Sequence, residues 1–298
     1  MCAGYSVPRM LRVGPLRVGP LRVEPLRVEP LRVGPLRVGP LRVGPLRVGP
    51  LWAKTIGQHA NRMSDTTTNP ETTKRWTAPD GVGFIELLET FGDDLTVVNA
   101  ARVSFHKEVS SMRPADERLI HYLAEHQHVT PFFHPQARFR IKMPIFVARE
   151  WYRHQIGFAR NEVSRRYVDS RPECWCPATT DLRERDPKLK QGSRPDAVDG
   201  AAELHDKVGT FLTGAVGFYE ELLAAGVAPE IARAVLPQSM YTEFIETGSL
   251  AAYARLCGLR LGPDAQKEIR LYANGLATLL TPSFPVSWPA LSKDDRAT

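Results

Sequence analysis

Proline recurs at every fifth position of residues 11–50, which are eight copies of a five-residue unit, LRVGP or LRVEP. Each proline removes a backbone donor and stops a helix, so the arginines here cannot line one face of a transit-peptide helix. We therefore expect an extended, solvated, disordered arm. The sequence predicts a low-complexity extension over residues 1–82 and one folded domain over residues 83–298.

Two origins of this arm stay open. Met63 is followed by an ordinary polar stretch, SDTTTNPETTKRW, which favours a translated nucleotide repeat upstream of the true start. The alternative is a functional basic arm that binds nucleic acid. Its repeats lack aromatic residues for stacking, and Val, Gly and Pro dilute the charge, so only weak, salt-sensitive binding is expected.

The net charge of +6 belongs to the arm. Residues 1–62 hold eleven Lys and Arg against two Glu, whereas the remaining residues hold 28 against 31 acidic ones. A slightly acidic folded part does not support attraction to a polyanion, so nucleic acid is not an expected partner.

Cysteine content and hydropathy indicate the cellular compartment. Four scattered cysteines do not form a disulfide framework, and no run approaches the roughly 18 apolar residues of a membrane span, so we expect a soluble, cytoplasmic protein. Cys174 and Cys176 form a C-x-C pair without a second pair or a neighbouring His in sequence, so we expect no zinc site.

Residues 137–143 alternate between apolar and basic side chains, which predicts a half-buried strand. Pro144 suits the first turn of a helix through IFVAREWYRH. On that helix Glu150, Arg153 and His154 have the spacing of one face.

Helical spacing also predicts a helix over 116–126, and a polar stretch from Tyr167 to about Pro195 predicts a long loop or lid. Further helices are expected at 201–225, 229–235, 249–256 and 263–280. The order is mixed α and β, with helices dominating the second half.

Residues 144–167 place eight ionisable side chains beside an apolar run: Arg149, Glu150, Arg153, His154, Arg160, Glu162, Arg165 and Arg166. Most are guanidinium forks, which suit phosphate and carboxylate recognition. The segment predicts a phosphorylated or anionic ligand.

The same stretch resembles the signature of the flavin-dependent thymidylate synthase family, Arg-His-Arg followed by seven residues and Ser. Here it reads Arg153, His154, Gln155, then IGFARNEV, then Ser164. Gln155 replaces the second arginine, and eight residues precede the serine. We place the extra residue within GFAR.

Five more segments resemble family segments in the same order, from about residue 84 to 291. They are NAARVSF at 99–105, HVTPFFH at 128–134, KQGS at 190–193, GVAPEIARAVLP at 226–237 and CGLRLGPDAQKEI at 257–269.

The resemblance implies a single mixed α/β domain with a central sheet and helices. It also implies reductive methylation of dUMP to dTMP, with methylenetetrahydrofolate as carbon donor and NADPH-reduced FAD as hydride source. The family assembles as a homotetramer with each active site at subunit junctions.

Site residues follow from matching positions. Arg260 is the implied catalytic residue, holding the uracil and helping to ionise N3 so that C5 becomes nucleophilic. The implied dUMP contacts are Glu150, Arg153, Ser164, Arg165, Arg166, Arg233 and Arg260. The implied FAD contacts are Ser104, Thr130, Arg153, His154, Gln155 and Glu162.

A serine nucleophile and a histidine metal site are two other chemistries that we considered and do not expect. Ser164 lacks a partner base in any sequence pattern, so we interpret it as a dUMP contact rather than a nucleophile. His128 and His134 flank TPFF, which family members present to flavin and neighbouring chains, so they, together with His121 and His126, are not expected to bind metal.

The departures from the family pattern predict a remodelled flavin site. Gln155 can hydrogen-bond but brings no charge, and Arg160 is the nearby cation expected to replace it. Residues 249–255 and Asp264 depart as well. They motivate the alternative of a divergent nucleotide-binding paralogue that has lost flavin chemistry.

Overall fold

A computed structural model describes residues 74–168, 170–188 and 192–292. The predicted strand at 137–143 is present in it as β3 (Gln136–Pro144), at the centre of the sheet. Its apolar side chains are buried and its basic ones point to the other face. It pairs antiparallel with β2 (Phe84–Phe91) on one side and β7 (Tyr241–Ser249) on the other.

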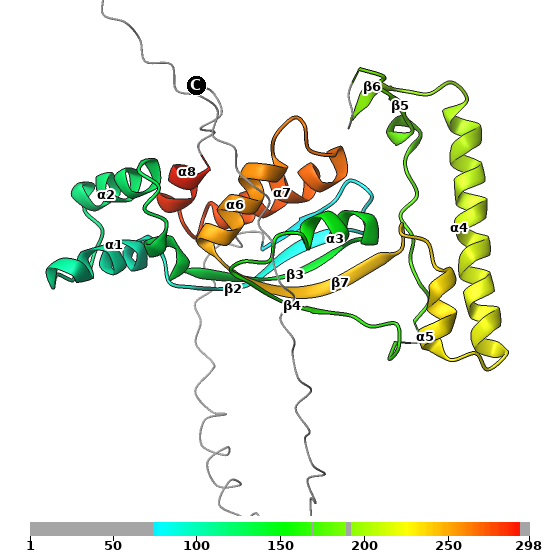
Figure 1. Cartoon of the computed structure of the whole chain (residues 1–298), viewed down its shortest axis with the longest axis horizontal. Coiled ribbons are helices and arrows are strands. Elements are labelled where there is room, and N and C mark those ends of the chain that lie inside the picture. Colours follow the sequence, from blue (N-terminus) through cyan, green and yellow to red (C-terminus); the bar gives the residue numbers. More distant parts are fainter. Residues whose placement is uncertain (1–73, 169, 189–191, 293–298) are drawn as a thin grey trace, which may run out of the picture. The chain divides into compact units, whose positions relative to one another are not determined.

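The sheet has the order β1-β2-β3-β7-β4, and all of its pairs are antiparallel (Figure 1). The outer strands are β1 (Arg75–Thr77) and β4 (Phe158–Glu162). The first strand precedes Gly83, where we expected folded sequence to begin. It belongs to the sheet because Trp76 packs on Tyr272, with ring centroids 5.3 Å apart.

Helices α3, α6 and α7 lie over one face of the sheet (Figure 1). Their buried side chains join those of β2, β3 and β7 in one core, where the largest include Trp151, Tyr253, Phe139 and Phe244. A mixed α and β fold is confirmed. The helices are α1 (Asp94–Arg102), α2 (Pro114–Glu125), α3 (Ile145–Trp151), α4 (Ala201–Ala224), α5 (Pro229–Ala232), α6 (Leu250–Arg260), α7 (Lys267–Leu280) and α8 (Ser287–Leu291), with 3-10 turns η1 (Val103–Phe105), η2 (Thr130–Phe133), η3 (Thr179–Asp181) and η4 (Arg233–Val235).

The predicted helices occur, with some ends shifted. The helix after Pro144 stops at Trp151 rather than at His154, because the chain then turns toward Gly157, which has a positive φ of 84°. The last long helix starts at Lys267 rather than 263, after a turn. The expected loop or lid contains η3 and a small hairpin of β5 (Arg183–Arg185) and β6 (Ser193–Ala197).

The sequence did not predict strands β4 and β7. The buried positions of β7 include Thr242, Glu246 and Gly248, so polar and small residues hide its alternation. Gly248 is required there because a Cβ would meet the ring of Phe158 at 2.6 Å. The neighbouring strand can therefore pack its aromatic ring directly on the backbone.

Several expectations lie outside the described residues. These are the repeat arm, the start at Met63, and Lys190 and Gln191 of the KQGS segment. Residues 67–298 form one compact unit. Within the part of the chain that the structure describes, no helix has the length and apolar character needed to span a membrane.

Candidate functional site

Arg260, the last residue of α6, lies against the C-terminal end of α3. Its Nε donates to His154 Nε2 at 3.0 Å, and its Nη2 donates to the backbone carbonyl of Glu150 at 3.2 Å. Its Nη1 lies 3.5 Å from the Glu150 carboxylate. Helical spacing predicted one face for Glu150, Arg153 and His154, but α3 ends at Trp151 and Arg153 is exposed, and it is Arg260 that joins Glu150 to the buried His154. A guanidinium held in this way can stabilise negative charge on a ligand ring.

His154 is buried, with 8% of its surface exposed. Burial lowers the pKa of this imidazole to about 4, and the positive charges of Arg260, Arg160, Arg255 and Arg153 act in the same direction. The neutral ring can accept the hydrogen bond from Arg260, which a protonated ring cannot. The group therefore stays intact at neutral pH.

We predict that His154 stays neutral down to about pH 5. Because its folded-state pKa lies below the ordinary value of 6.5, its contribution to stability is complete above pH 6.5 and declines as pH falls toward about 4. An NMR titration of the imidazole signal, assigned with His154→Gln, measures this. A midpoint near 6.5 would contradict the geometry.

Arg160 lies in β4 and forms an ion pair with Glu246, its register partner on β7. Glu246 is fully buried, and Trp151 Nε1 donates to both of its carboxylate oxygens at 3.2 Å. Burial raises the pKa of Glu246, while Arg160 and Trp151 oppose the shift. The expectation that Arg160 replaces the charge missing at Gln155 is wrong, because its Nε is bound to Glu246 and the segment is a strand rather than an inserted turn.

Arg255 is a cation that the fold brings to the residue after Gln155. Its Nη2 donates to the backbone carbonyl of Ile156, the next residue. Arg255 also lines a pocket of about 430 Å³ between α2, η2, α6 and α8. Sequence reasoning noted that 249–255 departs from the family pattern but did not place Arg255 here, since the contact spans 99 positions.

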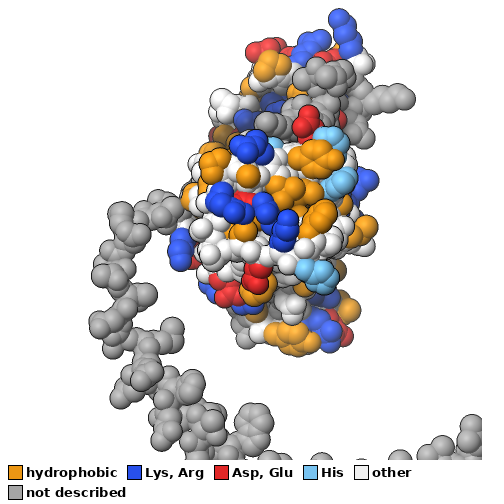
Figure 2. All heavy atoms as spheres, turned by 90° about the vertical axis from the view of Figure 1, so that its left-hand side faces the viewer, with side chains coloured by type: hydrophobic (Ala, Val, Ile, Leu, Met, Phe, Trp, Pro, Cys, Tyr) orange, Lys and Arg blue, Asp and Glu red, His pale blue; other side chains and the backbone are white. Residues whose placement is uncertain are grey.

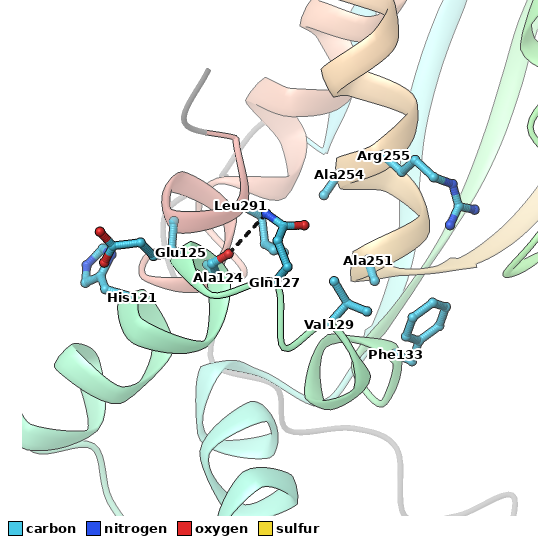
Figure 3. Close-up of a pocket in the computed structure, with 11 residues that line it drawn as sticks. His121, Ala124, Glu125, Gln127, Val129, Phe133, Ala251, Ala254, Arg255 and Leu291 are labelled. Atoms are coloured by element: carbon cyan, nitrogen blue, oxygen red, sulfur yellow. Dashed lines mark hydrogen bonds between the residues drawn. The ribbon is translucent and has the colours of Figure 1, made fainter. Parts of the chain in front are cut away.

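The walls of this pocket are mostly apolar. Figure 3 shows Val129 and Phe133 on one side and Ala251, Ala254 and Arg255 of α6 on the other. Gln127 donates to Ala124 O at 3.4 Å, and the polar side chains of His121 and Glu125 also line the pocket, on the side away from Phe133. Thr130, an expected FAD contact, lies in η2 between Val129 and Phe133. An apolar chamber with a cation at its edge suits a flat ring that carries an anionic tail.

A second basic group lies near α5. Arg166 Nη2 is 3.4 Å from the Glu230 carboxylate, and Arg233 Nε donates to the Glu230 backbone carbonyl at 3.4 Å. Both arginines are exposed. Ser164 Oγ accepts from the backbone N–H of Arg166 at 3.3 Å, and Arg165 donates to the Ser170 carbonyl.

The structure thus arranges the expected residues as two groups on different elements. Glu150, His154 and Arg260 meet at α3 and α6, whereas Ser164, Arg165, Arg166 and Arg233 gather at α5 and the turn after β4. The remaining expected contacts are exposed and belong to neither group. They are Ser104 in η1, Thr130 in η2, Arg153 and Gln155 after α3, and Glu162 at the end of β4. Glu162 accepts a hydrogen bond from Thr242 at 2.5 Å.

Cys176 has a histidine neighbour after all. His205 Nδ1 lies 3.7 Å from Cys176 Sγ, a neighbour that the sequence did not reveal because it is 29 positions away. That nitrogen also donates to the Pro177 carbonyl at 2.8 Å, so it carries a proton and is not a free ligand. Burial raises the pKa of both loop thiols. Over residues 74–168, 170–188 and 192–292, no three His, Cys, Asp or Glu side chains are grouped to hold a metal ion.

The surface on the α1 and α2 side is mixed in character. Figure 2 shows Lys and Arg side chains there among hydrophobic, acidic and histidine side chains. A field of one sign, which a nucleic-acid surface requires, is not present on this face.

These groups make a candidate site for an anionic ligand on a mixed α/β fold. The thymidylate synthase complementing protein family model matches residues 86–286. The chain is 39% identical over 212 residues to a flavin-dependent thymidylate synthase of Thermus thermophilus, covering 71% of this chain and 76% of the relative. It is 38% identical over 221 residues to that of Thermosipho africanus, covering 71% and 91%. The chain belongs to this flavin-dependent thymidylate synthase family, as its motifs predicted.

A solved structure is also similar. The UMP/dUMP methylase PolB from Streptomyces cacaoi, bound with 5-Br dUMP, has a TM-score of 0.63 and 30% identity, covering 70% of this chain and 94% of that chain. Its complex with 5-Br UMP gives a TM-score of 0.58 at 31% identity.

Proposed function

We propose that the protein methylates dUMP at C5 to form dTMP, with methylenetetrahydrofolate as carbon donor and NADPH as reductant. The observation that carries this proposal is the guanidinium of Arg260, held on Glu150 and the neutral His154 at the end of α3. Relatives named flavin-dependent thymidylate synthase and a similar UMP/dUMP methylase structure support the same reaction.

Arg260 would act on the pyrimidine. C5 of uracil becomes nucleophilic as negative charge develops at N3 and O4, and a fixed, permanently charged fork stabilises that charge. Glu150 and His154 hold the fork in place before the ligand arrives, so little reorganisation is needed. Because His154 is neutral, it adds no competing positive charge.

Arg166 and Arg233 would bind the 5′-phosphate, with Ser164 and Arg165 beside them. Both arginines are exposed and each contacts Glu230, while the Arg166 guanidinium also lies over the Tyr167 ring, 5.6 Å from its centroid. A dianionic phosphate is a stronger partner for such forks than one carboxylate or carbonyl. The separation of this group from Arg260 supports a site completed across subunits of a homotetramer.

FAD fits the residues present. The pocket between η2 and α6 would take part of the cofactor, and Thr130, which follows the pocket residue Val129, would contact it together with Arg153, His154 and Gln155. Arg255 would supply the charge that Gln155 lacks, since it donates to the residue next to Gln155. Ser104 and Glu162 complete the proposed contacts. When bound, FAD accepts a hydride from NADPH and supplies it for the reduction of the transferred group.

Bound flavin separates a synthase from a paralogue without redox chemistry. We predict a yellow protein whose flavin absorbance bleaches on anaerobic addition of NADPH, and faster with dUMP present. Arg255→Gln is expected to weaken FAD binding about tenfold, the effect of one charge-assisted contact, whereas Arg270→Gln, outside the proposed site, serves as the matched control. Protein that binds dUMP but takes up no FAD would favour the paralogue.

We also propose a cytoplasmic location and a catalytic domain that covers residues 83–298. Three described cysteines, Cys174, Cys176 and Cys257, are free thiols, which suits a reducing compartment. The domain assignment is supported by the family match over residues 86–286.

A further inference from the structure

Cys174 and Cys176 point to the same side of an extended segment. Cys174 forms an isolated antiparallel bridge with Met240, so the backbone here has strand geometry. Successive side chains of such a segment alternate between its two sides. The residue between the thiols, Trp175, packs on Phe146 with ring centroids 5.2 Å apart. The two thiols therefore face away from that contact, side by side.

The two thiols line one cavity of about 260 Å³ beside α4. Both are half-buried or less deeply covered than the core, and both are free of a disulfide. Gly209 of α4 leaves open space in the cavity wall, because a Cβ there would meet no atom within 4 Å. The other lining residues are Arg171, Pro172, Leu212, Thr213 and Val216. Apart from the Thr213 hydroxyl, the two sulfurs are the side-chain atoms of this lining that can donate electrons to a cation.

We propose that the cavity binds one soft, thiophilic cation, Cu(I), between the Cys174 and Cys176 sulfurs. Soft thiolates select Cu(I), and two ligands in line satisfy this ion. Zn²⁺ takes four ligands, but the described residues group no three His, Cys, Asp or Glu side chains for a metal. His205 Nδ1, 3.7 Å from Cys176 Sγ, donates to the Pro177 carbonyl and so is not a ligand.

The spacing of the two cysteines suits a bridging ion better than a disulfide. Residues two apart in an extended segment have Cα atoms about 6.6–6.8 Å apart, at the upper end of the disulfide range. A disulfide draws the sulfurs to about 2 Å, whereas a bridging ion needs them about 4.6 Å apart, twice a metal–sulfur distance of about 2.3 Å. The ion can therefore bind while Cys174 keeps its bridge to Met240.

Binding changes the charge of the site but not the oxidation state of the ion. Each thiol loses its proton to solvent as its S–Cu bond forms, so two thiolates and one Cu(I) leave a single negative charge. Arg171 lines the cavity itself. Burial raises the pKa of Cys174, and the positive charge of Arg165 opposes that rise. These two guanidinium groups therefore compensate the charge of the bound complex.

Competition for Cu(I) against bicinchoninate, under anaerobic conditions with ascorbate, tests the proposal. The full chain is used in a Cys2→Ser background, because Cys2 lies outside the described residues. We expect one Cu(I) per chain. Cys174→Ser and Cys176→Ser should each lower the affinity by more than about 100-fold, since outer-shell partners alone account for about 10- to 100-fold. X-ray absorption at the copper edge should show two sulfur neighbours.

Two variants serve as matched controls. Cys257→Ala removes a buried thiol on α6, which donates to the Ala273 carbonyl at 3.7 Å, and should leave the affinity unchanged. His205→Gln should also leave it unchanged, because the imidazole is not a ligand. Cu(I) should raise the Tm of the wild-type chain but not that of the serine variants, whose Tm without copper shows that they fold.

Three results would each overturn the proposal: a reduced chain that takes up no Cu(I), serine variants that keep the wild-type affinity, or a nitrogen ligand to copper that is lost in His205→Gln. An equal loss of affinity in Cys257→Ala would do the same. None of these results bears on dUMP methylation, because the site shares no ligand with the Arg260 group and copper binding is read without turnover.

Discussion

Arg260→Ala is expected to lower kcat for dTMP formation by about 10²- to 10³-fold, the usual loss when a fixed donor to developing negative charge is removed. Arg260→Lys should remain nearly as impaired. Lysine keeps the charge but cannot contact both His154 Nε2 and the Glu150 carbonyl with one planar fork, as Arg260 does. Steady-state kinetics at saturating dUMP measures the effect.

Arg260→Ala should also raise the pKa of His154, because the positive charge of Arg260 is, after burial, the largest cause that lowers it. NMR titration of the variant reads this independently of turnover. Arg270→Ala, a half-buried arginine on α7 outside the proposed site, is the matched control for loss of a guanidinium. If Arg260→Ala kept wild-type kcat, the assignment of the catalytic group would be wrong.

Glu246→Ala is expected to be the most destabilising single substitution near the site, lowering the free energy of unfolding by about 3–5 kcal/mol. It leaves Arg160, whose side chain is 15% exposed, without its carboxylate, and it removes the acceptor of the buried Trp151 indole. Trp151 holds the last turn of α3, where His154 N–H donates to the Trp151 carbonyl at 3.2 Å. The site should therefore loosen as well.

A double substitution distinguishes the effect of breaking the Arg160–Glu246 ion pair from the effect of removing side-chain volume. Arg160→Met with Glu246→Met removes both charges, so it should be much less destabilising than Glu246→Ala. Glu243→Ala is the control on the same strand, since its ion pair with Arg140, at 3.7 Å, is half-exposed and should contribute less than about 1 kcal/mol. Urea unfolding at one protein concentration measures all of them. A loss below about 1 kcal/mol for Glu246→Ala would contradict this role.

The parts of the fold that sequence predicted are those whose pattern is local. β3 alternates cleanly because one face packs on helices and the other meets solvent, and Pro144 marks where α3 begins. β7 is also central, but its buried positions include Thr242 and Glu246, whose burial depends on partners far along the chain. No local pattern reports such a partner.

The same reasoning explains the site. Helical spacing predicted that Glu150 and His154 lie close together, but α3 ends before His154, and Arg260, supplied by motif matches to the family, is the residue that joins the two. Arg160 was misassigned because sequence alone could not show that its register partner is a buried glutamate. Arg255 was missed because the residue it contacts lies in a loop 99 positions earlier.

The most direct test of dUMP methylation uses dUMP tritiated at C5, because a methyl group can replace the C5 hydrogen only if that hydrogen leaves. With methylenetetrahydrofolate and NADPH added to the flavin-bound protein, the account predicts release of tritium into water, one for each dTMP formed, and release that depends on both co-substrates. Binding of dUMP with no tritium release under these conditions would contradict the proposed reaction.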